Sequence, residues 1–96
     1  MDIDVIKREL NITWEDEITD KEVQDAMTSA KAIIDDFAGE SVDFDTDLVA
    51  AQLYKDAARY YFNKVGDEFE VRFQPQLIAL RTRYQVKRYE QQEDEV

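Results

Sequence analysis

The stretch Ile18–Gly39, ITDKEVQDAMTSAKAIIDDFAG, decides how the rest of the chain can fold. Thr19 and Glu22 have the spacing of a capping box. In such a box the hydroxyl of the first residue accepts a hydrogen bond from an unpaired backbone N–H, and the carboxylate of the second residue accepts one from the N–H of the first. Gly39 stands where a residue in the left-handed conformation commonly ends a helix. The stretch therefore predicts one amphipathic helix that packs into a small α-rich domain. The apolar residues that share its inner face are Val23, Met27, Ala30, Ile33, Ile34 and Phe37.

A short helix is predicted before this stretch, at Asp2–Leu10. Ile3 and Ile6 fall on one face of it, and its first turn is acidic, which the helix dipole favours. Asn11 is expected to end it. Trp14, the single tryptophan, is expected to pack the first helix onto the second, with a role as an interface anchor as the alternative.

Two helices are predicted after Gly39. The first covers residues 46–64 with a wide apolar stripe, and Asp45 or Asp47 is expected to cap its start. Pro75 fits the first turn of a last helix, which is expected to fade after Tyr89.

Phe69, Val71 and Phe73 alternate with charged residues between these two helices. A period of two predicts a short extended segment at residues 69–73. Its apolar side chains either cover the chain's own core or contact a neighbouring subunit. The predicted fold class is thus mainly all-α, a small bundle of about four helices with one short extended segment near residues 69–73.

The composition limits the chain to one small domain without the usual catalytic groups. Its 96 residues suffice for a single helical domain, predicted at residues 1–89, with a disordered acidic tail at residues 90–96. There is no histidine, no cysteine and no glycine-rich phosphate loop, so neither an enzyme nor a cofactor is expected. Residues 43–48, DFDTDL, alternate aspartates as a calcium loop does, but leucine stands where that loop needs glycine, so no metal site is expected.

The charges are unevenly placed along the chain. Residues 1–47 carry 15 acidic and 4 basic side chains, so the whole net charge of −11 lies there. Residues 77–89 carry four basic side chains and no acid. The split is typical either of a solvated surface or of head-to-tail association between an acidic face and a basic helix. The candidate interface residues are Glu22, Asp25, Asp36, Phe69, Val71, Phe73, Arg81, Arg83, Lys87 and Arg88.

Four stretches in this order resemble the head–tail connector (head-completion adaptor) family of tailed bacteriophages and prophages. They are VIKRELNI at residues 5–12, the acidic turn and long helix at residues 16–39, DLVAAQLYKDAARYYFNK at residues 47–64 and FQPQLIALRTRYQV at residues 73–86. The resemblance covers nearly the whole chain, and the order and spacing of the stretches are more specific than any one of them.

The resemblance implies a structural protein of the virion. Copies would form a homo-oligomeric ring beneath the portal protein, extend the DNA channel and offer a docking surface to the next neck or tail protein; a monomer in free solution is compatible with this. Since the chain is acidic, DNA is expected to pass without specific binding. The expected location is the head–tail junction of the virion, and the host bacterial cytoplasm during assembly. No membrane association is expected. The alternative function is a small acidic regulator or nucleic-acid mimic that binds a basic partner.

Overall fold

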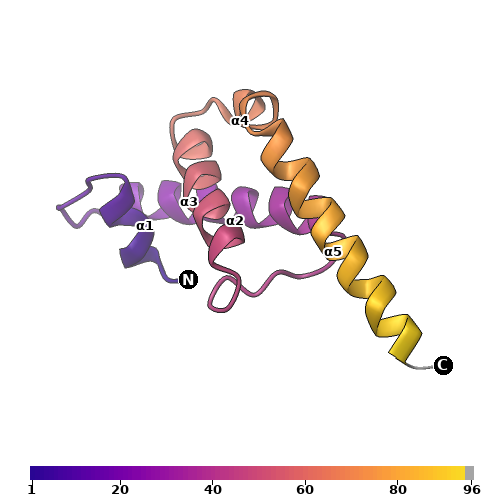
Figure 1. The fold of residues 1–96 in the computed structure, drawn as a ribbon. Helices are drawn as coiled ribbons and strands as arrows, with labels where there is room; N and C mark the ends of the chain where they lie inside the picture. Colours follow the sequence, from indigo (N-terminus) through magenta and orange to yellow (C-terminus); the bar gives the residue numbers. More distant parts are fainter. Residues whose placement is uncertain (95–96) are drawn as a thin grey trace.

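The chain folds into an all-α bundle. The computed structural model describes the backbone of residues 1–94, and within them it contains five helices and no strand. The fold class is confirmed, although the bundle has one helix more than predicted. None of the described helices combines the length and the apolar composition that crossing a membrane requires. In chain order the helices are α1 (Ile3–Glu9), α2 (Glu17–Ala38), α3 (Leu48–Phe62), α4 (Gly66–Arg72) and α5 (Gln74–Asp94) (Figure 1).

Three aspartates cap the starts of the first three helices. The carboxylates of Asp2, Asp16 and Asp47 each accept a backbone N–H from the first turn that follows. The predicted capping box of α2 is therefore wrong, because the helix begins earlier, at Glu17. The hydroxyl of Thr19 donates to Asp16 Oδ2 at 2.9 Å instead of serving as the cap. Asp16 is the N-cap, and its carboxylate accepts the Ile18 N–H at 3.3 Å.

Residues in the left-handed conformation follow the ends of α1, α2 and α3. Gly39 has a φ of +78° and its N–H donates to Asp35 O, as predicted for the end of α2. Asn11 has a φ of +59° after α1, which confirms it as the terminator, and Lys64 has a φ of +62° after α3. Asparagine tolerates this conformation better than lysine does.

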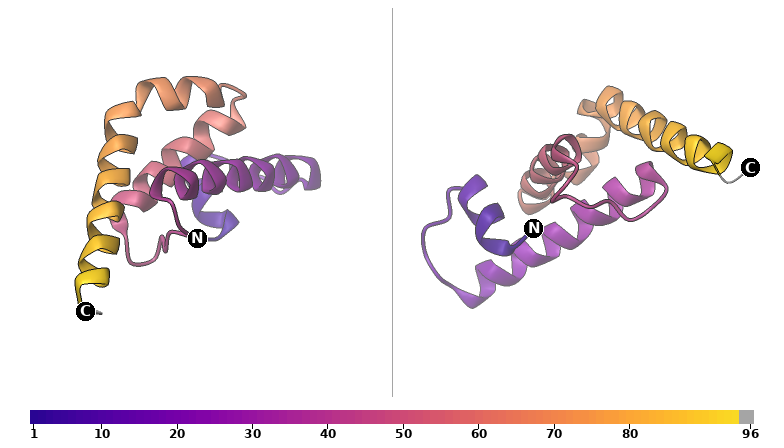
Figure 2. Two further views of the ribbon diagram at one scale, coloured as in Figure 1. Left: turned by 90° about the vertical axis from the view of Figure 1, so that its right-hand side faces the viewer. Right: turned by 60° about the horizontal axis from the view of Figure 1, so that its bottom comes forward.

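The core lies where α2 and α3 pack against each other, with α1 across one end (Figure 2). Ala30, Ala50, Ala57 and Ala58 are fully buried, and their small side chains let the two helices approach closely. Ile6 of α1 is also fully buried. The bundle therefore closes around small residues from the middle of the chain.

Residues 69–72 lie in α4 and Phe73 is the C-cap of that helix, so the predicted extended segment is wrong. Phe69 is fully buried, Phe73 stacks on it with ring centroids 4.9 Å apart, and Val71 is 75% exposed. Residues four apart share a helical face, whereas the residue between them points elsewhere. Three apolar residues at alternate positions fit the two-residue period of a strand, and the first and third also fit the 3.6-residue period of a helix. A segment of five residues is too short for the pattern to distinguish a strand from a helix.

Helix α5 buries a narrow stripe of side chains. Among its residues 74–91, whose side chains the structure describes, the buried ones are Leu77, Leu80 and Tyr84. The helix continues to Asp94, beyond the predicted end at Tyr89, and its C-terminal half extends away from the body (Figures 1 and 2). The disordered tail predicted from residue 90 thus differs from the helical backbone there, and residues 95–96 lie outside the described residues.

Candidate functional site

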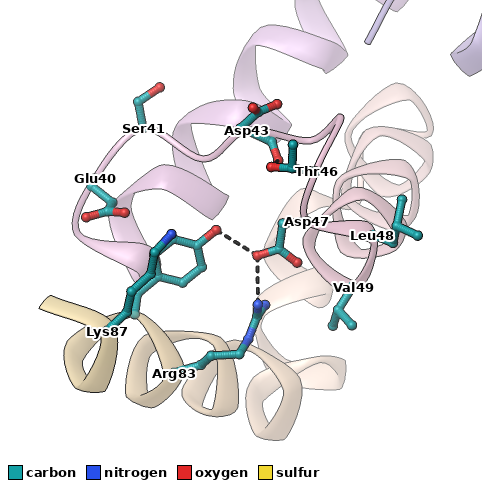
Figure 3. Close-up of a pocket in the computed structure, with 10 residues that line it drawn as sticks. Glu40, Ser41, Asp43, Thr46, Asp47, Leu48, Val49, Arg83 and Lys87 are labelled. Carbon is teal, nitrogen blue, oxygen red and sulfur yellow. Dashed lines mark hydrogen bonds and ion pairs between the residues drawn. The ribbon is translucent and has the colours of Figure 1, made fainter. Parts of the chain in front are cut away.

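The segment between α2 and α3 meets α5 at Asp47. An open pocket of about 500 Å³ lies there, between the loop at residues 40–47 and the face of α5 that carries Arg83 and Lys87 (Figure 3). Asp47 stands at its centre as the N-cap of α3, and Leu48 and Val49 follow on the first turn (Figure 3). We call the contacts around this carboxylate the Asp47 junction.

The Asp47 carboxylate binds three donors from two elements. It accepts the Ala50 N–H at 3.0 Å, Arg83 Nη1 at 2.8 Å and the Tyr84 hydroxyl at 2.7 Å. Only 11% of its side chain is exposed. Burial acts to raise the pKa of Asp47, but the hydrogen bonds from Arg83, Tyr84 and Ala50 outweigh it and the pKa is lowered. Asp47 therefore fixes the start of α3 and the position of α5 with one charged group.

Tyr84 is the partner most strongly affected by this carboxylate. Burial, followed by the hydrogen bond to Asp47 and the charge of Asp47, raises the pKa of Tyr84 to about 12. The phenol is therefore neutral at physiological pH and acts as a hydrogen-bond donor. The proton therefore stays on the Tyr84 oxygen, and the hydrogen bond joins α5 to the start of α3.

Arg88 provides a second contact between α5 and the end of α2. Its Nη1 donates to Ala38 O at 2.7 Å and lies 3.4 Å from Glu40 Oε2. A cation is favourable at a helix C-terminus, where the carbonyl groups have no partners within the helix. Of the four basic residues predicted as an interface, Arg83 and Arg88 thus contact their own chain.

Arg81 and Lys87 lie over aromatic rings. The guanidinium of Arg81 is 4.8 Å from the Phe37 ring centroid, and the ammonium of Lys87 is 5.5 Å from that of Tyr84. Both side chains are exposed, and neither makes an ion pair with another residue in the described part of the chain. Their charges face solvent.

The acidic residues predicted for the interface are divided along α2. Glu22 and Asp25 border a depression beside Tyr61 and Lys64 at the end of α3. Asp36 is exposed nearer the end of α2, next in sequence to Phe37, over which Arg81 lies. The structure therefore does not bring Glu22, Asp25 and Asp36 into one site.

Phe69, Val71 and Phe73 are divided between the core and the surface. Phe69 belongs to the core and Phe73 is partly buried against it. Val71 alone of the three faces solvent, near Ile78 and Arg81 in a shallow depression. A partner could reach Val71 without unfolding the chain.

An apolar groove separates α3 from α5 and was missed by sequence reasoning. We call it the α3–α5 groove. It has a volume of about 640 Å³. Leu48 and Val49 are largely exposed on its wall, which the helical pattern could have signalled, because they fall off the face defined by the buried residues of α3. Its apolar lining consists of Leu48, Val49, Leu53, Phe73, Ala79 and Leu80.

Trp14 was predicted to be buried, and the structure corrects this. The indole is exposed, and its Nε1 donates to Thr19 Oγ1 at 3.5 Å, so it lies beside the first turn of α2. Ile18 in that turn is exposed as well. We call Trp14 and Ile18 the N-terminal ridge. The position of Trp14 in an acidic connecting segment was the available signal, since a buried tryptophan needs apolar neighbours.

No metal-binding cluster of three or more histidine, cysteine, aspartate or glutamate side chains exists within the described residues. Asp43 Oδ1 accepts the Asp45 N–H at 2.9 Å, while Asp47 is engaged with α5. The aspartates of this loop therefore act locally as turn and cap residues.

Comparisons of the chain with models of protein families, with curated proteins and with solved structures give no match. The interpretation of these surfaces therefore depends on their own residues and geometry.

Proposed function

We propose that the chain is a structural assembly protein of tailed bacteriophages, a head–tail connector whose copies form a ring between portal and tail. The observation that carries the proposal is that one small helical body has two different uncovered apolar surfaces, the N-terminal ridge and the α3–α5 groove. A ring is built from heterologous contacts, in which each subunit offers two different surfaces. A symmetric dimer would need only one.

The position of the two surfaces supports this proposal. The ridge lies at the start of α2, whereas the groove is lined by the first part of α3 and by residues 73–83. Surfaces on different sides of a subunit allow each copy to contact two neighbours at once.

Helix α5 supports it in a second way. Beyond the buried Tyr84, Val86 and Tyr89 of α5 are exposed, and the end of this helix extends from the body (Figure 1). An apolar side chain on an extending helix suits contact with another protein. In the proposed ring this part of α5 docks on the portal or on the next neck protein.

The test is assembly of the purified full chain, alone and with the portal protein from the same genome. Light scattering and electron microscopy should reveal rings on the portal, and rings or monomers without it. A chain that stays monomeric and ignores the portal at every salt concentration contradicts the proposal. The alternative, an acidic regulator or nucleic-acid mimic, gains support if a pull-down recovers a DNA-binding protein instead of virion proteins.

A further inference from the structure

We propose that the N-terminal ridge of one copy docks into the α3–α5 groove of the next copy. This inference rests on the proposed function, because it names the contact through which the ring forms. It commits to a second copy of this chain as the occupant of the groove.

The groove has the size and lining of a site for apolar side chains. Its volume of about 640 Å³ lies within the roughly 300–1,000 Å³ of pockets that hold a small apolar ligand. Leu53 and Leu80 are buried at its base, and Leu48 and Val49 are exposed on its wall. Covering the two exposed side chains removes apolar surface from water, which favours an occupant that is itself apolar.

The ridge is the apolar feature proposed to fill this groove. Trp14 is 54% exposed and Ile18 is 72% exposed, so both still have apolar surface to bury. The indole lies beside the first turn of α2, where its Nε1 donates to Thr19 Oγ1 at 3.5 Å. Tryptophan is enriched among the residues that dominate binding energy.

The charges around the two surfaces are complementary. Glu15, Asp16 and Glu17 surround the ridge, and all three are exposed. Arg83 and Asp56 line the groove; Arg83 pairs with Asp47, and Asp56 pairs with Arg59.

Arg83 is the more exposed of the two charged residues that line the groove. Its side chain is 47% exposed, whereas that of Asp56 is 17% exposed and that of its own partner Asp47 is 11% exposed. The charged group that a neighbour can contact directly at the groove is therefore the Arg83 guanidinium, and the groups that surround the ridge are carboxylates. This arrangement favours head-to-tail docking and opposes ridge-to-ridge contact.

Cysteine cross-linking tests the contact directly, because the natural chain has no cysteine. Separate Ile18→Cys and Val49→Cys proteins are mixed under mild oxidation, alone and with portal. The expected result is a disulfide-linked dimer in the mixture and none with either variant alone, since head-to-tail docking pairs residue 18 only with residue 49. Val71→Cys, also on an exposed valine but outside the groove, is the matched control and should not cross-link to Ile18→Cys.

Substitutions test the contribution of each surface. Trp14→Ala should weaken subunit association about 30-fold, the effect of a central interface residue, and leave the far-UV circular dichroism unchanged because the indole is exposed. Val49→Asp should weaken it similarly, whereas Val71→Asp should not. Added salt should weaken the association of the unaltered chain.

The outcomes separate this inference from the proposed function. Rings on the portal without the 18–49 cross-link overturn the inference and leave the function standing. The cross-link without any binding to portal supports the docking and contradicts the connector function. A cross-link between positions 18 and 71 shows that the ridge docks beside Val71 and not in the α3–α5 groove, and it overturns the inference. The absence of both rings and cross-links overturns both proposals.

Discussion

Removing the Asp47 carboxylate should destabilise the fold more than removing any neighbouring carboxylate of the loop. Asp47→Ala takes away the N-cap of α3 and the acceptor for Arg83 and Tyr84 of α5 in one step. The helices that this group joins, α3 and α5, both also pack against α2 and α4. The substitution therefore affects both local and long-range structure.

The expected loss is about 3 kcal/mol in the free energy of unfolding. The cap contributes about 1 kcal/mol. The buried Tyr84 hydroxyl loses an ionised acceptor, which costs about 1.5–3 kcal/mol. Arg83 is half exposed and returns to water, so it adds little. For a domain of this size, 3 kcal/mol corresponds to roughly 12–24 °C in the melting temperature.

Urea unfolding followed by far-UV circular dichroism measures this loss. Asp45→Ala is the matched control, because Asp45 is exposed in the same loop and its carboxylate accepts no hydrogen bond from another described residue; it should change stability by less than about 0.5 kcal/mol. Asp47→Asn keeps a capping oxygen and should lose about half as much as Asp47→Ala. An Asp47→Ala protein as stable as Asp45→Ala would refute the reasoning.

Three further predictions concern Tyr84, Phe69 and Gly66. Because the pKa of Tyr84 is raised to about 12 in the folded chain, its neutral hydroxyl stabilises the fold below pH 10, and this contribution is lost as pH rises from about 10 to about 12; the urea midpoint should therefore fall less over that interval in Tyr84→Phe than in the unaltered chain. Phe69→Ala should cost about 3–5 kcal/mol in urea unfolding, because the ring is fully buried, while Val71→Ala two residues away should cost less than about 0.5 kcal/mol. Gly66→Ala should lower stability by about 1–3 kcal/mol, measured by thermal melting, because a Cβ there would overlap the Tyr61 ring; Tyr61→Ala should make the glycine substitution harmless.

Local signals predicted most of the fold correctly. The helical periodicity of residues 18–39, the left-handed glycine at residue 39 and the aspartate before α3 act over a few residues, so the sequence displays them directly. The exact start of α2 was harder, since Asp16 and Thr19 both carry oxygens that can cap. The spacing of the apolar residues at positions 69, 71 and 73 covers only five residues, so it could not distinguish α4 from a strand.

The long-range contacts of the site could not be read from the sequence. Asp47 and Arg83 are 36 residues apart, and Ala38 and Arg88 are 50 apart. Either arginine could equally have faced solvent, because a basic residue on a helix has many acidic residues within reach in a chain of net charge −11. Only the crossing of α5 over the end of α2 selects these partners.

The same crossing explains which side chains remain available for assembly. Arg83 and Arg88 hold α5 by its inner side, together with the buried Leu80. A helix fixed through so narrow a stripe exposes both flanks, and one flank becomes a wall of the α3–α5 groove. The basic helix that the sequence suggested as an interface thus has two roles on different sides. Leu77 and Tyr84 on its buried stripe stabilise the monomer, and in the proposed ring the groove beside it binds the next copy, so substitutions in the stripe should affect folding and substitutions at Val49 on the groove wall should affect assembly.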